Sequence, residues 1–147
     1  MDRRVPATVL LLEGRDEVRA AYSEALRAAG LHVTEAHTSE QVQDALEAIN
    51  PSIIVVSFDA QTRDDRLSLC RAVKADPRTR RIPIVLTTSD MTSDDVGLAT
   101  DPGVLVLTLA FSDGAKLAAA INGVLAAQRA EPLRTSLRRR REVKRSA

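Results

Sequence analysis

The stretch LCRAVKADPRTRRIPIVLTT, residues 69–88, carries the most specific pattern in the chain. Its first half predicts a helix, because apolar residues such as Leu69 and Val73 recur at helical spacing. The pair Asp76-Pro77 ends that helix, since the residue before a proline disfavours helical backbone. The run from Ile82 to Thr87 then predicts a buried strand. A helix followed directly by a strand is the repeating unit of an α/β fold.

The same alternation extends outward in both directions. Further strands are predicted at Val9–Leu12, Leu31–Ala36, Ile53–Val56 and Val104–Leu109. Helical patterns lie between the strands. The first covers residues 18–29 and ends at Gly30, and the second runs from a capping box at 38–41 to residue 49 and ends at Pro51. A weak helix is predicted at 93–100, and Ser112 caps the last helix. Strands joined by single helices run parallel. We therefore predict an α/β fold of the (βα)5 type, a doubly wound five-stranded parallel sheet with helices on both faces.

Composition and charge separate a body from a tail. The chain has 147 residues and a formal net charge of +1. Residues 128–147 contain eight basic and two acidic side chains, a net charge of +6, which leaves −5 for residues 1–127. We predict an acidic domain at 7–127 and a basic, disordered tail at 128–147.

Neither a membrane span nor a disulfide framework is predicted. No apolar run approaches the roughly 20 residues that cross a bilayer. The single cysteine, Cys70, falls on the inward side of its helix and is expected to be an inert core residue. These limits favour a cytoplasmic protein.

Candidate site residues follow from the predicted topology. In a parallel α/β sheet the functional site lies at the carboxyl ends of the strands. The residues that fall there are Glu13, Gly14, Ser57, Phe58, Asp59, Thr87, Thr88, Leu109 and Ala110.

Five segments in order resemble the receiver domain of bacterial response regulators, across about residues 7–127. They are VLLLEGRDEVR, ALRAAGLHVTEA, NPSIIVVSFD, LCRAVKADPRTRRIPIVLTTS and LTLAFSDGAKLAAAI. The resemblance implies a flavodoxin-like receiver topology. It also implies a phosphoryl-accepting aspartate at the end of the third strand and two acidic residues after the first strand that help bind magnesium. A Thr or Ser then ends the fourth strand and a Lys ends the fifth.

This chain departs from that pattern at most of the reactive positions. The first acidic position is Glu13, either a residual metal ligand or a strand-end charge paired with Arg15 or with solvent, whereas the second is Gly14. The acceptor position falls on Ser57 and the lysine position on Leu109. Only the hydroxyl that ends the fourth strand (the switch hydroxyl) remains, as Thr88, or as Thr87 if the register is shifted by one residue.

The missing groups predict a degenerate pseudo-receiver. One carboxylate beside an arginine offers magnesium too few anionic oxygens. A serine without an adjacent base is a weak nucleophile, and a leucine supplies no charge for a phosphoryl oxygen. We therefore expect no cofactor and no enzymatic activity.

In one alternative the chain still accepts a phosphoryl group. Asp59 lies two residues beyond Ser57, and a bulge would bring it to the acceptor position. The chain would then be a phospho-accepting receiver using Asp59 with Glu13 and Thr88, and magnesium would be bound by Glu13 and Asp59.

The favoured function is a stand-alone two-component or phosphorelay signalling module that acts by protein–protein interaction. The expected surface is the region Thr92–Gln128, through a protein partner or self-association, because its small side chains suit flat packing. The tail, centred on Arg138, Arg139, Arg140 and Arg141, has three interpretations. It is a solvated end, it docks on an acidic protein surface including the chain's own body, or it makes the chain a nucleic-acid or anionic-lipid adaptor.

Overall fold

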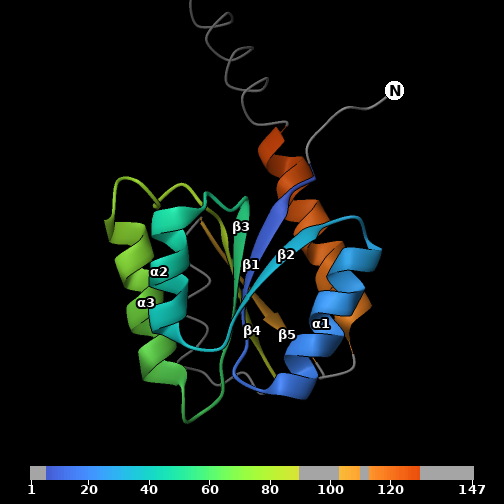
Figure 1. Ribbon diagram of the computed structural model, residues 1–147, viewed down its shortest axis with the longest axis horizontal. Coiled ribbons are helices and arrows are strands. Elements are labelled where there is room, and N and C mark those ends of the chain that lie inside the picture. The colour runs from blue at the N-terminus through green and yellow to red at the C-terminus, as the bar shows by residue number, and fades with distance from the viewer. Residues whose placement is uncertain (1–5, 90–102, 110–112, 130–147) are drawn as a thin grey trace, which may run out of the picture.

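A five-stranded parallel sheet lies between two layers of helices. The computed structural model describes residues 6–89, 103–109 and 113–129. The elements are β1 (Thr8–Leu12), α1 (Asp16–Ala28), β2 (His32–Ala36), α2 (Ser39–Ala48), β3 (Ile53–Ser57), α3 (Arg63–Ala75), β4 (Ile84–Thr88), β5 (Val104–Thr108) and a C-terminal helix described over 114–129. The strand order is β2-β1-β3-β4-β5 (Figure 1). The predicted doubly wound parallel sheet is confirmed; the helix predicted at 93–100 and the cap at Ser112 lie outside the described residues.

Alternating side chains of the strands build two cores. Val9 and Leu11 of β1 join a cluster with α1 and the C-terminal helix, whereas Leu10 and Leu12 join one with α2 and α3. Figure 1 shows these helix pairs on opposite faces of the sheet. Every residue of β3 is buried, as expected for a central strand covered on both faces. Among the described residues no helix is long and apolar enough to cross a membrane.

Cys70 belongs to the second of these cores, as predicted. Its thiol is buried, and burial raises the pKa of Cys70 to about 11. Because the thiolate is the reactive form, a thiol with this pKa stays protonated and unreactive near neutral pH.

The boundaries of β4 differ from the prediction of Ile82–Thr87. The strand begins at Ile84, because Pro83 has no N–H to donate to a ladder. The Ile84 N–H instead starts the pairing with a 2.9 Å bond to the Gly103 carbonyl. The strand continues to Thr88, which is in register with Thr108 of β5.

The predicted helix signals are largely confirmed. Gly30 has a φ of 86°, the left-handed conformation that glycine adopts just after a helix end. At the start of α2 the Thr38 hydroxyl accepts from the Gln41 N–H at 3.2 Å, which is one half of the capping box. The other half is displaced, because the Gln41 side chain accepts from the N–H of His37 at 2.8 Å rather than from that of Thr38.

Gly114 permits close packing between the C-terminal helix and α1. A Cβ added there would lie 2.7 Å from the Cβ of Ala25, too close for either helix to remain in place. We expect Gly114→Ala to destabilise the domain by about 1–2 kcal/mol, because overpacking outweighs the gain in helix propensity. Urea denaturation followed by circular dichroism measures the change.

Gly123 of the same helix provides the matched control. A Cβ there meets nothing within 4 Å, so Gly123→Ala is expected to stabilise by about 0.5–1 kcal/mol. If both substitutions shifted stability in the same direction, the contact with Ala25 would not explain Gly114.

Candidate functional site

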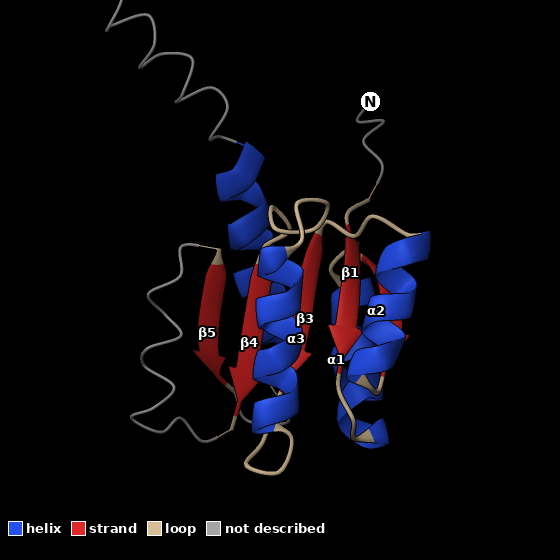
Figure 2. Cartoon of the chain, turned by 90° about the vertical axis from the view of Figure 1, so that its left-hand side faces the viewer, coloured by secondary structure: helices blue, strands red, loops and turns tan. Residues whose placement is uncertain are grey.

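The predicted site residues gather at the carboxyl end of the sheet, where β1, β4 and β5 all point (Figure 2). Glu13 follows β1, Ser57 ends β3, Thr88 ends β4 and Leu109 follows β5. A cavity of about 210 Å³ opens here. Its lining consists of Glu13, Gly14, Arg15, Ser57, Phe58, Asp59, Thr62 and Arg66.

Glu13 is buried and ion-paired with Arg15. Only 2% of Glu13 is exposed, and its Oε1 accepts hydrogen bonds from the Arg15 backbone N at 3.0 Å and from Nε at 2.9 Å. The Ser57 side chain is also hydrogen-bonded to this carboxylate. Burial raises the pKa of Glu13, but the hydrogen bonds from Arg15 and Ser57 together outweigh it and hold that pKa below its usual value. Of the two alternatives for Glu13, the structure shows the pairing with Arg15.

This donor set fits a magnesium ion poorly. The Arg15 guanidinium occupies the Glu13 carboxylate and also interacts electrostatically with Asp59. Magnesium needs several oxygen ligands in near-octahedral array, and Gly14 contributes no side chain. Among the described residues no cluster of three or more His, Cys, Asp or Glu is placed to hold a metal.

Asp59 lies beyond the strand and holds the loop before α3. Its Oδ1 accepts from the N–H groups of Gln61 and Thr62, both at 2.9 Å, and from the Thr62 hydroxyl at 3.1 Å. The backbone hydrogen bond from Thr62 is the largest cause that lowers the pKa of Asp59. Pairing between β3 and β4 runs without a bulge to Ser57, which is in register with Thr87. Ser57 rather than Asp59 therefore occupies the last strand position.

Arg66 of α3 is a site residue that sequence reasoning missed. It is buried, and its Nε lies 3.4 Å from the Ser57 carbonyl oxygen. Its Nη1 donates to Ser39 Oγ at 3.2 Å and to Asp65 Oδ2 at 2.6 Å. The signal was its helical spacing from Cys70 and Val73, which places residue 66 on the inward face of α3.

The Arg66 guanidinium also lies against the second acidic position of the family pattern. A Cβ built on Gly14 would be 3.7 Å from Arg66 Nη2 and 3.8 Å from the His37 carbonyl oxygen. A carboxylate side chain at residue 14 would therefore lie next to the buried Arg66 guanidinium and would pair with it rather than with a metal ion. The site thus has two arginines, Arg15 and Arg66, around the positions where the resemblance implies acidic metal ligands.

The lysine position is part of the hydrophobic core. Leu109 is only 2% exposed and packs in the cluster that contains Val85 and Leu117. Its N–H donates to the Thr88 carbonyl at 2.9 Å, so the β4–β5 ladder extends to it. No charge reaches the cavity from this position, whereas Ala110, the next candidate, lies outside the described residues.

The remaining candidates are buried at the ends of β3 and β4. Phe58 packs in the core under α2 and α3, and its N–H donates to the Thr87 carbonyl at 2.9 Å. Thr88 is buried and takes part in further interactions. The Thr87 hydroxyl is buried and has no hydrogen-bond partner in the described part of the chain. Thr87 is in register with Ser57, and the assignment of the switch hydroxyl to Thr88 or to Thr87 stays a prediction.

Comparisons with solved structures identify the fold. No family model and no curated protein matches the chain. A sensor protein from Polaromonas sp. JS666 superposes with a TM-score of 0.72 at 18% identity, over 84% of this chain and 98% of that one. The signal receiver domain of a histidine kinase from Syntrophus aciditrophicus gives 0.65 at 18% identity over 82% and 91%. A phosphorylated cyanobacterial phytochrome response regulator gives 0.66 at 16% identity over 84% and 96%. The chain therefore has the response-regulator receiver fold.

Proposed function

We propose that this protein is a receiver-fold module of two-component signalling that takes no phosphoryl group and acts by binding another protein. The observation that carries the proposal is the Glu13–Arg15 ion pair, in which an internal cation satisfies the one carboxylate left at the first acidic position. Solved structures of the same fold, described as a receiver domain and as response regulators, support the signalling role.

The side chains around the cavity argue against phosphoryl transfer. Ser57 is hydrogen-bonded to Glu13, whose lowered pKa makes this carboxylate a weak base for activating a hydroxyl. Leu109 offers no ammonium to the charge that develops on a phosphoryl oxygen. Asp59, the alternative acceptor, is engaged by three hydrogen-bond donors of its own loop.

The interaction surface is proposed at Thr92–Gln128. Its described part comprises β5, an edge strand of the sheet, and the C-terminal helix. Leu105 of β5 is 38% exposed and is the exposed large hydrophobic side chain in the described ranges. An apolar side chain on an edge strand fits contact with a partner or with a second copy of the chain.

We expect no phosphorylation when the protein is incubated with acetyl phosphate and magnesium. Intact-mass spectrometry measures the result, because a phosphoryl adduct adds about 80 Da. A phosphorylatable receiver domain in the same tube shows that the reagent is active. An adduct on the wild-type chain that disappears in Asp59→Asn would establish the alternative, a functional receiver that uses Asp59.

A further inference from the structure

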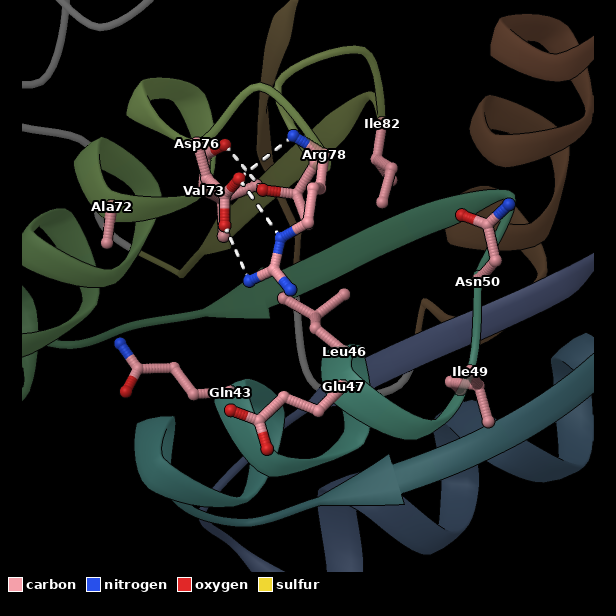
Figure 3. A pocket seen from close by; sticks show the side chains of 11 residues that line it. Gln43, Leu46, Glu47, Ile49, Asn50, Ala72, Val73, Asp76, Arg78 and Ile82 are labelled. Carbon is pink, nitrogen blue, oxygen red and sulfur yellow. Dashed lines mark hydrogen bonds and ion pairs between the residues drawn. The ribbon is translucent and has the colours of Figure 1, made fainter.

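A groove lies between α2 and α3 at the amino end of the sheet, opposite the site described above. It has a volume of about 260 Å³ (Figure 3). Apolar side chains line it, among them Leu46, Val73 and Ile82. On its rim Arg78 pairs with Asp76 at 3.1 Å, and the carboxylate of Glu47 lies on the α2 side. The groove thus has a mixed lining, in which Asp76 is paired with Arg78 and Glu47 adds a further carboxylate on the α2 side.

Glu47 belongs to a row of carboxylates along α2. Glu40, Asp44 and Glu47 are exposed and are spaced four and three residues apart, so they share one face of the helix. Helix α2 contains no basic residue, and none of the three lies within ion-pair distance of another described residue, although Arg78 interacts electrostatically with Glu47. Helix α1 differs, because its acidic side chains are accompanied by Arg19 and Arg27.

The described chain ends at the same end of the molecule as this groove. Arg129 lines a hollow together with Pro6, Ser52 and Asn50, and Asn50 also lines the groove between α2 and α3. Figure 1 shows the end of the C-terminal helix, the α2–β3 connection and the α3–β4 loop at one end of the molecule. A chain that continues from Arg129 therefore starts at a hollow that shares Asn50 with the groove.

We propose that the basic segment 130–147 docks on the body of its own chain, along α2 and into this groove. The segment has seven basic and two acidic side chains, a net charge of +5 that complements the carboxylates of α2. Leu133 and Leu137, which precede the arginine run, are the apolar side chains that enter the groove. From Arg129 to Lys144 the chain spans up to about 50 Å when extended, more than the diameter of a small domain. This docking surface shares no lining residue with the cavity at the carboxyl end of the sheet, so the docking does not depend on the function proposed for that cavity.

Carbodiimide cross-linking of the full chain at low salt tests the docking. The reagent joins a lysine amine to a carboxylate as an amide, with loss of one water. Lys144 is the one lysine in the segment, so its cross-links report where the segment lies. After proteolysis, mass spectrometry is expected to find Lys144 joined to Glu40, Asp44 or Glu47 in the monomer. At 1 M salt, where the Debye length is about 3 Å, the yield is expected to fall on the order of tenfold.

Matched variants decide between this surface and any other. The triple variant E40Q/D44N/E47Q should lose the cross-link, whereas D16N/E17Q/E24Q, with three neutralised acids on α1, should retain it. Replacing Leu133 and Leu137 by Asn should lower the yield, and replacing Thr135 and Ser136 by Asn should not. Equal yields in the two triple variants, cross-links only in a dimer, or coupling of Lys144 to other carboxylates would overturn the proposal.

Discussion

Replacing Arg15 by Met is expected to reverse the contribution of Glu13 to the pH dependence of stability. In the wild type the hydrogen bonds from Arg15 and Ser57 hold the pKa of Glu13 below its usual value. A carboxyl group with a lowered pKa stabilises the fold above its unfolded pKa, near 4.5, and this contribution is lost as the pH falls through the lower folded value. Without Arg15, burial dominates and raises the pKa of Glu13. The variant then loses stability as the pH rises above about 4.5.

The expected loss in Arg15→Met is about 2 kcal/mol at pH 7. Leaving one partner of a fully buried ion pair uncompensated costs about 3–5 kcal/mol, and the Arg15 side chain is 40% exposed, which reduces the cost. Urea denaturation between pH 4 and 8, followed by circular dichroism, measures both the loss and its slope. The double variant E13Q/R15M has no carboxylate left unpaired at residue 13 and is expected to recover most of the stability. If the stability of Arg15→Met varied with pH as that of the wild type does, Arg15 would not set the ionisation of Glu13.

Replacing Arg66 by Ala is expected to lower the free energy of unfolding by about 3 kcal/mol, or the melting temperature by about 10 °C. The guanidinium connects the end of β3 to the start of α2 through the Ser57 carbonyl and Ser39 Oγ. Its removal takes a donor from the buried Ser57 carbonyl and deletes the packed stem of the side chain.

Two further variants separate these effects. Arg66→Met keeps a stem of similar length, so it isolates the loss of charge and hydrogen bonds. Arg71→Ala, on the exposed side of the same helix, is expected to change stability by less than about 0.5 kcal/mol. Equal melting temperatures for the alanine variants at 66 and 71 would mean that the contacts of Arg66 contribute little to the fold.

Much of the site was predictable because it depends on the order of the strands. Short apolar runs predicted every strand except the one at Leu31–Ala36, which was predicted from loose alternation, and parallel strands bring their carboxyl ends to one edge. Glu13, Ser57, Thr88 and Leu109 are therefore found at the same end of the sheet, as predicted. The predicted start of β4 at Ile82 was wrong. Ile82 is apolar like the strand, but the first N–H that can join the hydrogen-bond ladder after Pro83 is that of Ile84.

The role of Asp59 was open at the level of sequence. Spacing alone permitted either Ser57 or Asp59 at the strand end, because a bulge adds one residue without leaving a clear composition signal. The structure resolves the register through pairing: Ser57 is opposite Thr87, and the Phe58 N–H still bonds to β4. Asp59 comes after that bond and turns its carboxylate into the loop before α3.

The amino-acid sequence by itself determined the layered α/β architecture, the edge where a site would lie, and the replacement of reactive groups at that edge. Those features follow from hydrophobic periodicity and residue identity, which are local. Only the tertiary structure decided which charges meet. Arg66 contacts Ser39 from 27 positions away, and a long flexible side chain on a helix reaches such a partner only once both helices are packed on the sheet. Packing of α3 on the sheet therefore brings Arg66 to this site, whereas Arg15 is only two positions from Glu13 in the sequence.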